Sequence, residues 1–379
     1  MQVLILVTHL LGTGHLSRAL NLARAFVAHG HTVDVVSGGM PAPHLNTDGI
    51  TLHQLPAVRS DGTNFSTLLT AHDTAADQAY LTKRQRNIEG IFNTLQPDFL
   101  ITELYPFGRR VLSSEFLNLL STAKANTKRC AIFSSIRDIL APPSKPSKAT
   151  KADQIIAQYY DGVFVHSDPT TTPLDQSWPV SKTLAKKLHY TGYVAPTIAG
   201  PHPDLEGQNE IIVSAGGGSV GKAIFECAIE AASLDTSQNW RILVGGSNSA
   251  NEIKRLKKRA RSNNLTIEST RPDFRQMLHH AACSVSMCGY NTALDLMQTG
   301  TASVFIPFDE GGEVEQTLRA KSLAKHPGFS VLTANVLTPQ SLIESIHASR
   351  SVKGAEIAGL EFDGANETVR IATNWLKQT

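Results

Sequence analysis

Two glycine-rich turns, each directly after a predicted strand, carry the residues with the clearest chemical potential. The first lies in LVTHLLGTGHLSRAL, residues 6–20, and the second in IIVSAGGGSVGKA, residues 211–223. A strand, a glycine turn and a helix start bring several backbone N–H groups and a positive dipole end to one place. Such a place suits a phosphate or a developing anion. Two of them in one chain predict two Rossmann-like domains with parallel sheets that face each other across a cleft.

His15 is the sharpest candidate for proton transfer. It follows Gly14 at the predicted start of the first helix, and an imidazole can take a proton from a hydroxyl near neutral pH. A structural role, in which His15 caps the helix or bonds the loop, is the alternative. We expect Gly12 and Gly14 to line an acceptor site beside it.

The first turn also resembles the start of a dinucleotide-binding fingerprint, because Gly12 and Gly14 are two apart. Ser17 stands where the third glycine belongs, and the second strand ends in Ser-Gly-Gly, residues 37–39, where an acidic ribose partner is expected. The sequence therefore disfavours hydride transfer with NAD.

The second turn predicts a diphosphate site. It holds Gly216, Gly217 and Gly218 and then Ser219 at a helix start, and glycines let a backbone approach a ligand closely. The frame of a Walker motif fails at Ala223. A simple tight turn is the alternative interpretation.

Polar residues follow two further predicted strands of the first half. Glu103, Tyr105 and Arg109, with Arg110, come after the strand at residues 98–102, and Arg137 follows the next strand. The carboxyl ends of parallel strands form clefts, so Glu103 is a second catalytic candidate. The other residues are candidates for an acceptor site, in which arginines clamp a phosphate or carboxylate. Surface ion pairing is the alternative.

Short β-rich runs alternate with helical patterns along the chain, which predicts βαβ units. The predicted strands are residues 2–7, 32–37, 98–102, 129–134 and 162–166, then 210–214, 240–244, 265–269, 284–287 and 303–306, with the first helices at 16–28 and 75–95. We predict an N-terminal domain of residues 1–196, a Pro/Gly-rich linker of 197–209 and a C-terminal domain of 210–379. Residues 141–151 read as an exposed loop whose role as a lid is left open. An amphipathic helix over 367–378 is expected to pack on a domain, with a return to the N-terminal domain as one possibility.

Composition narrows the class of protein. The 379 residues carry a formal net charge of +2, which gives no indication of a nucleic-acid partner. The cysteines, in mainly apolar surroundings, are expected to be buried free thiols: Cys130, Cys227, Cys283 and Cys288. No apolar run approaches a membrane span and no secretory signal is visible. We therefore expect a cytoplasmic protein, with peripheral membrane contact and the choice between monomer and homodimer left open.

The segment SMCGYNTALDLMQTGTASVFIPFDEGGEVEQTLRAKSLA, residues 286–324, is the most specific part of the chain. It resembles the donor-binding region of GT-B fold nucleotide-sugar glycosyltransferases, in particular the group around the lipid II-forming N-acetylglucosaminyltransferase of peptidoglycan synthesis. The resemblance matches Gly289 and Asn291 to the turn after a strand and Asp295 to a carboxylate that binds the ribose. Pro307 matches a strand end, and Glu315-Gln316 match the pair that contacts the sugar.

The resemblance extends to both glycine turns. Gly12–Leu16 resembles the family's first glycine loop with its candidate base, and Gly216–Ser219 resembles the second. Two departures stand out: Asp295 occupies a position where Glu is usual, and the stretch 308–313 is more acidic than usual, which leaves the sugar open.

The resemblance implies an inverting glycosyltransferase of the hexosyltransferase type. It uses a nucleotide diphosphate sugar, with a UDP-sugar as the first guess, and transfers to an acceptor hydroxyl. The chain contains no D-x-D pair, so we expect backbone dipoles and hydroxyls, not a metal ion, to stabilise the leaving diphosphate. A nucleotide-sugar epimerase of the same fold and a non-catalytic sugar-nucleotide-binding protein are the alternatives.

Overall fold

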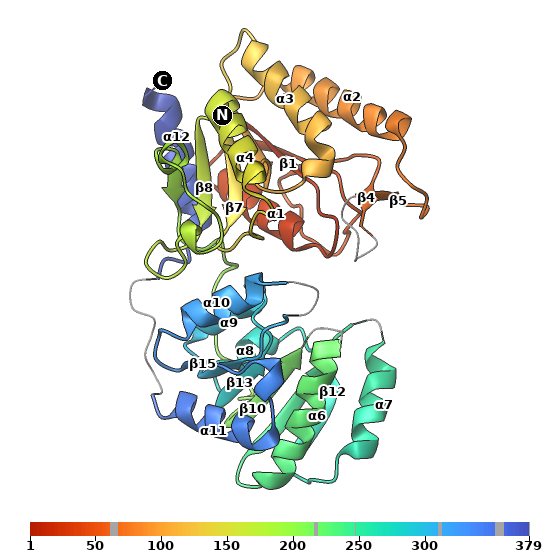
Figure 1. The fold of residues 1–379 in the computed structure, drawn as a ribbon, viewed down its shortest axis with the longest axis vertical. Coiled ribbons are helices and arrows are strands. Elements are labelled where there is room, and N and C mark those ends of the chain that lie inside the picture. Colours follow the sequence, from red (N-terminus) through yellow and green to blue (C-terminus); the bar gives the residue numbers. More distant parts are fainter. Residues whose placement is uncertain (61–66, 216–218, 247, 310–312, 353–359, 379) are drawn as a thin grey trace. The chain divides into compact units, whose positions relative to one another are not determined.

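The chain divides into two compact units, shown in the computed structural model of Figure 1. The structure describes residues 1–60, 67–215, 219–246, 248–309, 313–352 and 360–378. The first unit combines Met1–Pro196 with Glu361–Thr379, and the second is Thr197–Leu360. The segment predicted as a linker thus counts with the second unit. The C-terminal segment counts with the first, so the second unit ends before the range 210–379 that the sequence predicts.

The first unit is built on a parallel sheet of seven strands in the order β3-β2-β1-β6-β7-β8-β9. Alternate residues of the interior strand β1 face opposite sides, as the twofold period of a strand requires: Val3, Ile5 and Val7 enter one buried cluster, and Leu4 and Leu6 enter another. Both faces of the sheet are therefore covered. The strands are β1 Gln2–Val7, β2 Thr32–Ser37, β3 Thr51–Gln54, β6 Phe99–Glu103, β7 Ala131–Arg137, β8 Gly162–His166 and β9 Leu188–Tyr190.

Helices cover the two faces separately. The cluster on one face draws its helical residues from α1 and α12, and α2, α3, α4 and the short α5 supply those on the other. The C-terminal helix α12 packs against α1, and its Trp375 ring meets Phe133 of the sheet edge-on at 5.3 Å. The longer helices are α1 Gly14–Ala28, α2 Gln78–Leu95, α3 Ser113–Ala125, α4 Pro146–Tyr159 and α12 Gly364–Gln378, with a short α5 Lys182–Ala185 and a hairpin of β4 Val58–Arg59 and β5 Leu69–Thr70.

The second unit repeats the plan with a parallel sheet of six strands in the order β12-β11-β10-β13-β14-β15. The strands are β10 Glu210–Ala215, β11 Asn239–Val244, β12 Leu265–Ser269, β13 Cys283–Ser286, β14 Ser303–Phe305 and β15 Phe329–Val331. The helices are α6 Ser219–Leu234, α7 Ser249–Arg259, α8 Phe274–Met277, α9 Tyr290–Thr299, α10 Glu315–Leu323 and α11 Pro339–Arg350. The α/β class with two parallel sheets is therefore confirmed.

Several local predictions need correction. The short strands β3, β9 and β15 were not predicted, because they lack a clear period of buried residues. The predicted loop 141–151 is helical from Pro146 onward, where the ring takes the N1 position that tolerates a missing N–H.

The four cysteines are all buried free thiols, as predicted. In the described part of the chain, no helix combines the length and apolar character that a bilayer crossing requires.

Candidate active site

His15 lies in the first turn of α1, which begins at Gly14, two residues before the predicted start at residue 16. Gly12 turns the chain before it with a φ of +52°, a conformation that favours glycine. Strand β6 runs beside β1 with Leu6 opposite Thr102, so its last residue, Glu103, comes to the same edge of the sheet. His15 Nδ1 is 2.9 Å from Glu103 Oε1. The two catalytic candidates therefore form one pair.

Glu103 is the centre of a buried polar cluster. Its side chain is 2% exposed, and Oε1 also accepts a hydrogen bond from the Arg18 guanidinium. The other carboxylate oxygen accepts from Ser135 Oγ at 2.7 Å. Burial alone would raise the pKa of Glu103, but Arg18, His15 and Ser135 together lower it to about 2. The group is thus a carboxylate whose oxygens are already engaged.

His15 is held neutral. Burial is the main cause that lowers its pKa to about 3, and the charges of Arg109 and Arg18 act in the same direction, against Glu103. Since a carboxylate only accepts hydrogen bonds, His15 Nδ1 carries the proton that it donates to Glu103, and Arg18 Nη2, which lies 3.2 Å from the same nitrogen, donates to that carboxylate as well. The Nε2 lone pair is then available to take a proton, while Glu103 stabilises the imidazolium that would form.

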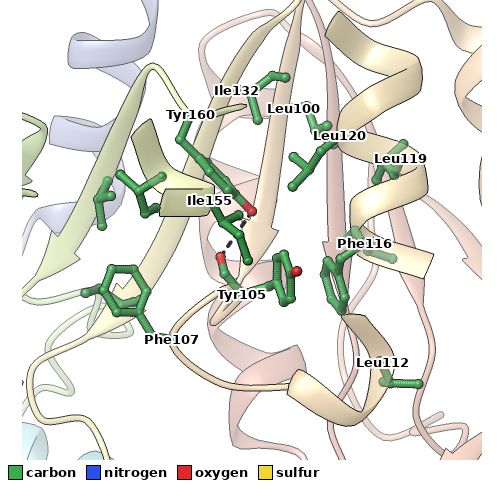
Figure 2. Close-up of a cluster of buried hydrophobic side chains, with 14 of the residues drawn as sticks. Leu100, Tyr105, Phe107, Leu112, Phe116, Leu119, Leu120, Ile132, Ile155 and Tyr160 are labelled. Atoms are coloured by element: carbon green, nitrogen blue, oxygen red, sulfur yellow. Dashed lines mark hydrogen bonds between the residues drawn. The ribbon is translucent and has the colours of Figure 1, made fainter. Parts of the chain in front are cut away.

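Two of the residues that the sequence singled out, Glu103 and Tyr105, have other roles than the predicted ones. Glu103 is too buried and too fully bonded to be an independent base, so its place is behind His15. Tyr105 is fully buried and stacks on Phe116 with ring centroids 4.5 Å apart. Figure 2 shows it inside the apolar cluster, where its carbonyl accepts from Tyr160 Oη. Tyr105 is therefore a core residue and not a contact for an acceptor.

Two of the arginines near this edge of the sheet donate hydrogen bonds to backbone carbonyls of the first unit. Arg109 Nε donates to the Thr8 carbonyl at 2.5 Å and so anchors the loop before His15. Arg110 Nη1 donates to the Phe107 carbonyl at 2.7 Å. Arg137 is the last residue of β7 and is half-buried. A role in binding an anionic acceptor stays a prediction for Arg109 and Arg137.

The structure describes only the residues on either side of the second glycine turn. Gly216, Gly217 and Gly218 lie outside the described residues, as does the side chain of Ser219, with which α6 begins. The helix start directly after β10 agrees with the predicted order of strand, turn and helix. Their contacts with a donor stay predictions.

Asp295 has a partner inside its own unit. Its Oδ1 is 2.7 Å from Arg275 Nε, and the same guanidinium donates to the Gln298 amide oxygen at 3.0 Å. Burial raises the pKa of Asp295, against the opposing charge of Arg275. The exposed Asn291 lies one turn earlier on α9, after Gly289 at the N-cap. The structure thus gives Asp295 an ion pair that the sequence did not predict.

The predicted sugar-contacting pair begins α10. Gln316 Oε1 accepts from the backbone N–H of Phe308 at 3.1 Å, which orients its amide, and the backbone N–H of Glu315 donates to Glu313 Oε1 at 2.7 Å. Arg319 of the same helix is buried and donates to the Cys288 carbonyl at 3.0 Å. It therefore ties α10 to the turn that contains Gly289.

The structure adds residues that the sequence did not point to: Arg18, Ser135 and His166 around Glu103, and Arg275 and Arg319 around the predicted donor residues. Arg18 alone had a local signal, because it lies three residues after His15 on the same helix face. In the described ranges, no group of three or more His, Cys, Asp or Glu side chains could hold a metal ion.

Comparisons with known proteins indicate the enzyme class and the fold of the chain. Residues 212–358 match the model of the glycosyltransferase family 28 C-terminal domain. An uncharacterised glycosyltransferase of Methanosarcina mazei is 21% identical over 360 residues, 88% of this chain and 86% of that protein. The chain is a glycosyltransferase.

Solved structures support the fold of this glycosyltransferase. MurG of Acinetobacter baumannii superposes with a TM-score of 0.65 and 14% identity, covering 99% of this chain and 100% of that one. The glycosyltransferase of kitacinnamycin reaches the same TM-score of 0.65 with 15% identity, over 100% of this chain and 98% of the other. The glycosyltransferase has the GT-B fold, as the resemblance implied.

Proposed function

We propose that the glycosyltransferase moves a hexosyl group from a nucleotide diphosphate sugar to an acceptor hydroxyl, with inversion and without a metal ion. The observation that carries the proposal is the pair of His15 and Glu103, 2.9 Å apart, directly after the first glycine turn. A neutral imidazole backed by a carboxylate is the arrangement that general-base catalysis of a single displacement needs.

In the proposed mechanism the acceptor hydroxyl gives its proton to His15 Nε2. Its oxygen forms a bond to the anomeric carbon as the bond from that carbon to the diphosphate breaks, which inverts the configuration. Glu103 stabilises the imidazolium through Nδ1–H. The N-terminal end of α6, Ser219–Leu234, stabilises the departing diphosphate with its dipole.

The second unit supplies the donor site in this proposal. Asp295 binds the ribose hydroxyls, Gln316 with Glu315 contacts the sugar, and the turn at Gly289 and Asn291 receives the nucleotide. Arg275 holds the Asp295 carboxylate in place for this role. A UDP-sugar is the first candidate, and the protein acts in the cytoplasm on an acceptor that carries an anionic group beside Arg109 and Arg137.

A thermal-shift screen of nucleoside diphosphates and their sugars tests the donor first. Stabilisation by one nucleotide family, with uridine diphosphate first in line, supports the proposal, and no shift with any of them contradicts it. Product analysis with that donor then follows. Sugar transferred to an added acceptor supports a transferase, an epimerised nucleotide sugar formed without acceptor supports an epimerase, and binding with no turnover supports a sensor.

Chelation tests the metal independence. We expect turnover to survive EDTA, because the chain lacks a D-x-D pair that would hold a cation on the diphosphate. Loss of turnover in EDTA that Mg²⁺ or Mn²⁺ restores would contradict that part of the proposal.

A further inference from the structure

The polar cluster behind His15 continues across three strands of the first unit. Ser135 on β7 lies directly opposite Glu103 on β6, and His166 ends the neighbouring strand β8. Ser135 Oγ is 3.0 Å from His166 Nε2, and His166 Nδ1 is 2.8 Å from Thr191 Oγ1. Ser135 and His166 are fully buried. We call Glu103, Ser135, His166 and Thr191 the polar row. Burying polar groups costs free energy that apolar residues at these positions would not, which suggests that the polar row has a function.

The direction of each hydrogen bond follows from the donor each group has. A carboxylate only accepts, so the single hydroxyl proton of Ser135 goes to Glu103. Ser135 Oγ must then accept from His166, which places the proton of His166 on Nε2. His166 Nδ1 is then unprotonated and faces Thr191 Oγ1 at 2.8 Å, a hydroxyl that also lies 2.9 Å from the Gly192 carbonyl. Burial lowers the pKa of His166 to about 3 and keeps the ring neutral, which agrees with this assignment.

The bonds of His166 and Ser135 therefore both point toward Glu103, and on the other side His15 donates to the same carboxylate. We infer that Ser135 and His166 are positioning residues, which hold the Glu103 carboxylate so that His15 keeps its proton on Nδ1 and its Nε2 lone pair for the acceptor. Neither residue touches substrate. The inference rests on the proposed function in one respect, the use of His15 as the base.

The row also limits where Glu103 can move. Its Oε2 is held by Ser135 and its Oε1 by Arg18 and His15. Without Ser135, the carboxylate keeps partners on one oxygen only and can rotate toward Arg18. His15 would then lose the acceptor that selects its tautomer.

The first test reads the tautomer of His15 directly, by ¹⁵N NMR of histidine-labelled protein without substrate. The spectrum of His15→Ala assigns the signal. We expect the Nδ1–H form in the wild type, and a mixture of tautomers in Ser135→Ala and His166→Leu. His166→Gln should stay close to the wild type, because its amide can still donate to Ser135.

Ser134→Ala is the matched control. Ser134 is the neighbouring, equally buried serine of β7, and its hydroxyl donates to the Tyr105 carbonyl at 2.8 Å, away from Glu103. It should cost stability and leave the His15 tautomer unchanged. An unchanged tautomer in folded Ser135→Ala and His166→Leu would overturn the inference, as would the same change in Ser134→Ala.

A double-mutant cycle separates positioning from general support of the fold. Ser135→Ala should lower kcat by roughly 10-fold to 100-fold, the scale of a lost buried hydrogen bond to a charged group, with KM for the donor unchanged. In a His15→Ala background the same substitution should have no further effect on kcat. An equal loss in both backgrounds would assign Ser135 a structural role. If His15→Ala alone keeps wild-type kcat, the proposed function fails, while the NMR result still decides whether the row sets the tautomer.

Discussion

The two predicted centres of this chain are built differently. In the first unit, His15 and Glu103 belong to one continuous buried row of polar side chains that includes Arg18, Ser135 and His166. In the second unit, the candidates are held separately, Asp295 by Arg275 and Gln316 by the backbone of Phe308. A row of this kind is expected where chemistry needs a fixed tautomer, and separate anchors are sufficient where a ligand only has to be bound.

The two centres also differ in the pKa shifts of their titratable groups. The pKa of His15 is lowered by burial and that of Glu103 by its cationic and hydrogen-bonded partners, so each holds one protonation state over a wide pH range. The pKa of Asp295 is instead raised by burial, and Arg275 opposes the shift. The protonation states of the first centre are therefore fixed before any substrate binds, whereas in the proposed donor site a ribose would share Asp295 with Arg275.

The largest expected effect is at His15. His15→Ala should lower kcat by roughly 10²-fold to 10⁴-fold, the usual scale for loss of a general base, and leave donor affinity nearly constant because the proposed donor residues belong to the other unit. Steady-state kinetics at saturating donor and calorimetry with the nucleotide measure both. His29→Ala, an exposed histidine at the end of the same helix, is the control and should behave as wild type. Near wild-type kcat in a folded His15→Ala protein would remove the chemistry from the first centre.

A substitution at Asp295 tests the second centre. Asp295→Ala should weaken nucleotide binding by about 1.5–3 kcal/mol, the scale of a lost hydrogen bond to a charged group, with kcat at saturating donor much less affected. Arg275→Gln is the partner variant, since it removes the ion pair and keeps the carboxylate. If both variants lower the melting temperature alike and neither changes the affinity measured by calorimetry, the pair is purely structural.

Acid should weaken the first unit. The folded state lowers the pKa of His15 and of His166 from 6.5 to about 3, so the unfolded chain binds more protons between these values. The free energy of unfolding should be constant above about pH 6.5 and fall as the pH drops toward 3. The lowered pKa of Glu103 decreases the free energy of unfolding further as the pH falls below the ordinary value of 4.5. The raised pKa of Asp295 acts in the opposite direction, because the folded state then binds the proton more tightly than the unfolded chain.

Fluorine NMR of 5-fluorotryptophan protein can follow the two units in one urea titration, because Trp178 is buried in the first and Trp240 in the second. Between pH 7 and pH 5 the midpoint at Trp178 should fall more than that at Trp240. His166→Gln should reduce the difference. Equal shifts at both tryptophans would contradict the prediction.

The smallest expected effect on the fold is at Gly14. A Cβ added there would have no heavy atom within 4 Å, and alanine suits a helix better than glycine. Gly14→Ala should therefore raise the free energy of unfolding by about 0.4–1 kcal/mol, as urea denaturation would measure. If an acceptor approaches this backbone, the same variant should raise KM for the acceptor. An unchanged KM would remove Gly14 from the acceptor site.

The sequence predicted the long interior strands of the two sheets better than the short strands near the sheet edges. Strands β1, β2 and β8 have the predicted bounds, because their apolar runs are long and bounded by turn residues. The exposed edge strand β3 and the three-residue strands β9 and β15 have no such pattern, and they form because a neighbouring strand offers hydrogen bonds. Strand β6 extends one residue further than predicted, which places Glu103 within the sheet opposite Ser135.

Local patterns determined the two α/β units, the glycine turn and helix start that carry His15, and the segment 286–324 that identifies a glycosyltransferase, because each depends on residues close together in the chain. Tertiary structure alone decided which groups meet. Glu103 and Tyr105 are two positions apart, yet one reaches His15 and the other lies inside the core (Figure 2). Arg18 on α1 and Ser135 on β7 bond to Glu103, and His166 on β8 bonds to Ser135. Parallel strands bring their carboxyl ends to one edge, and no spacing along the chain encodes which side chains will share it.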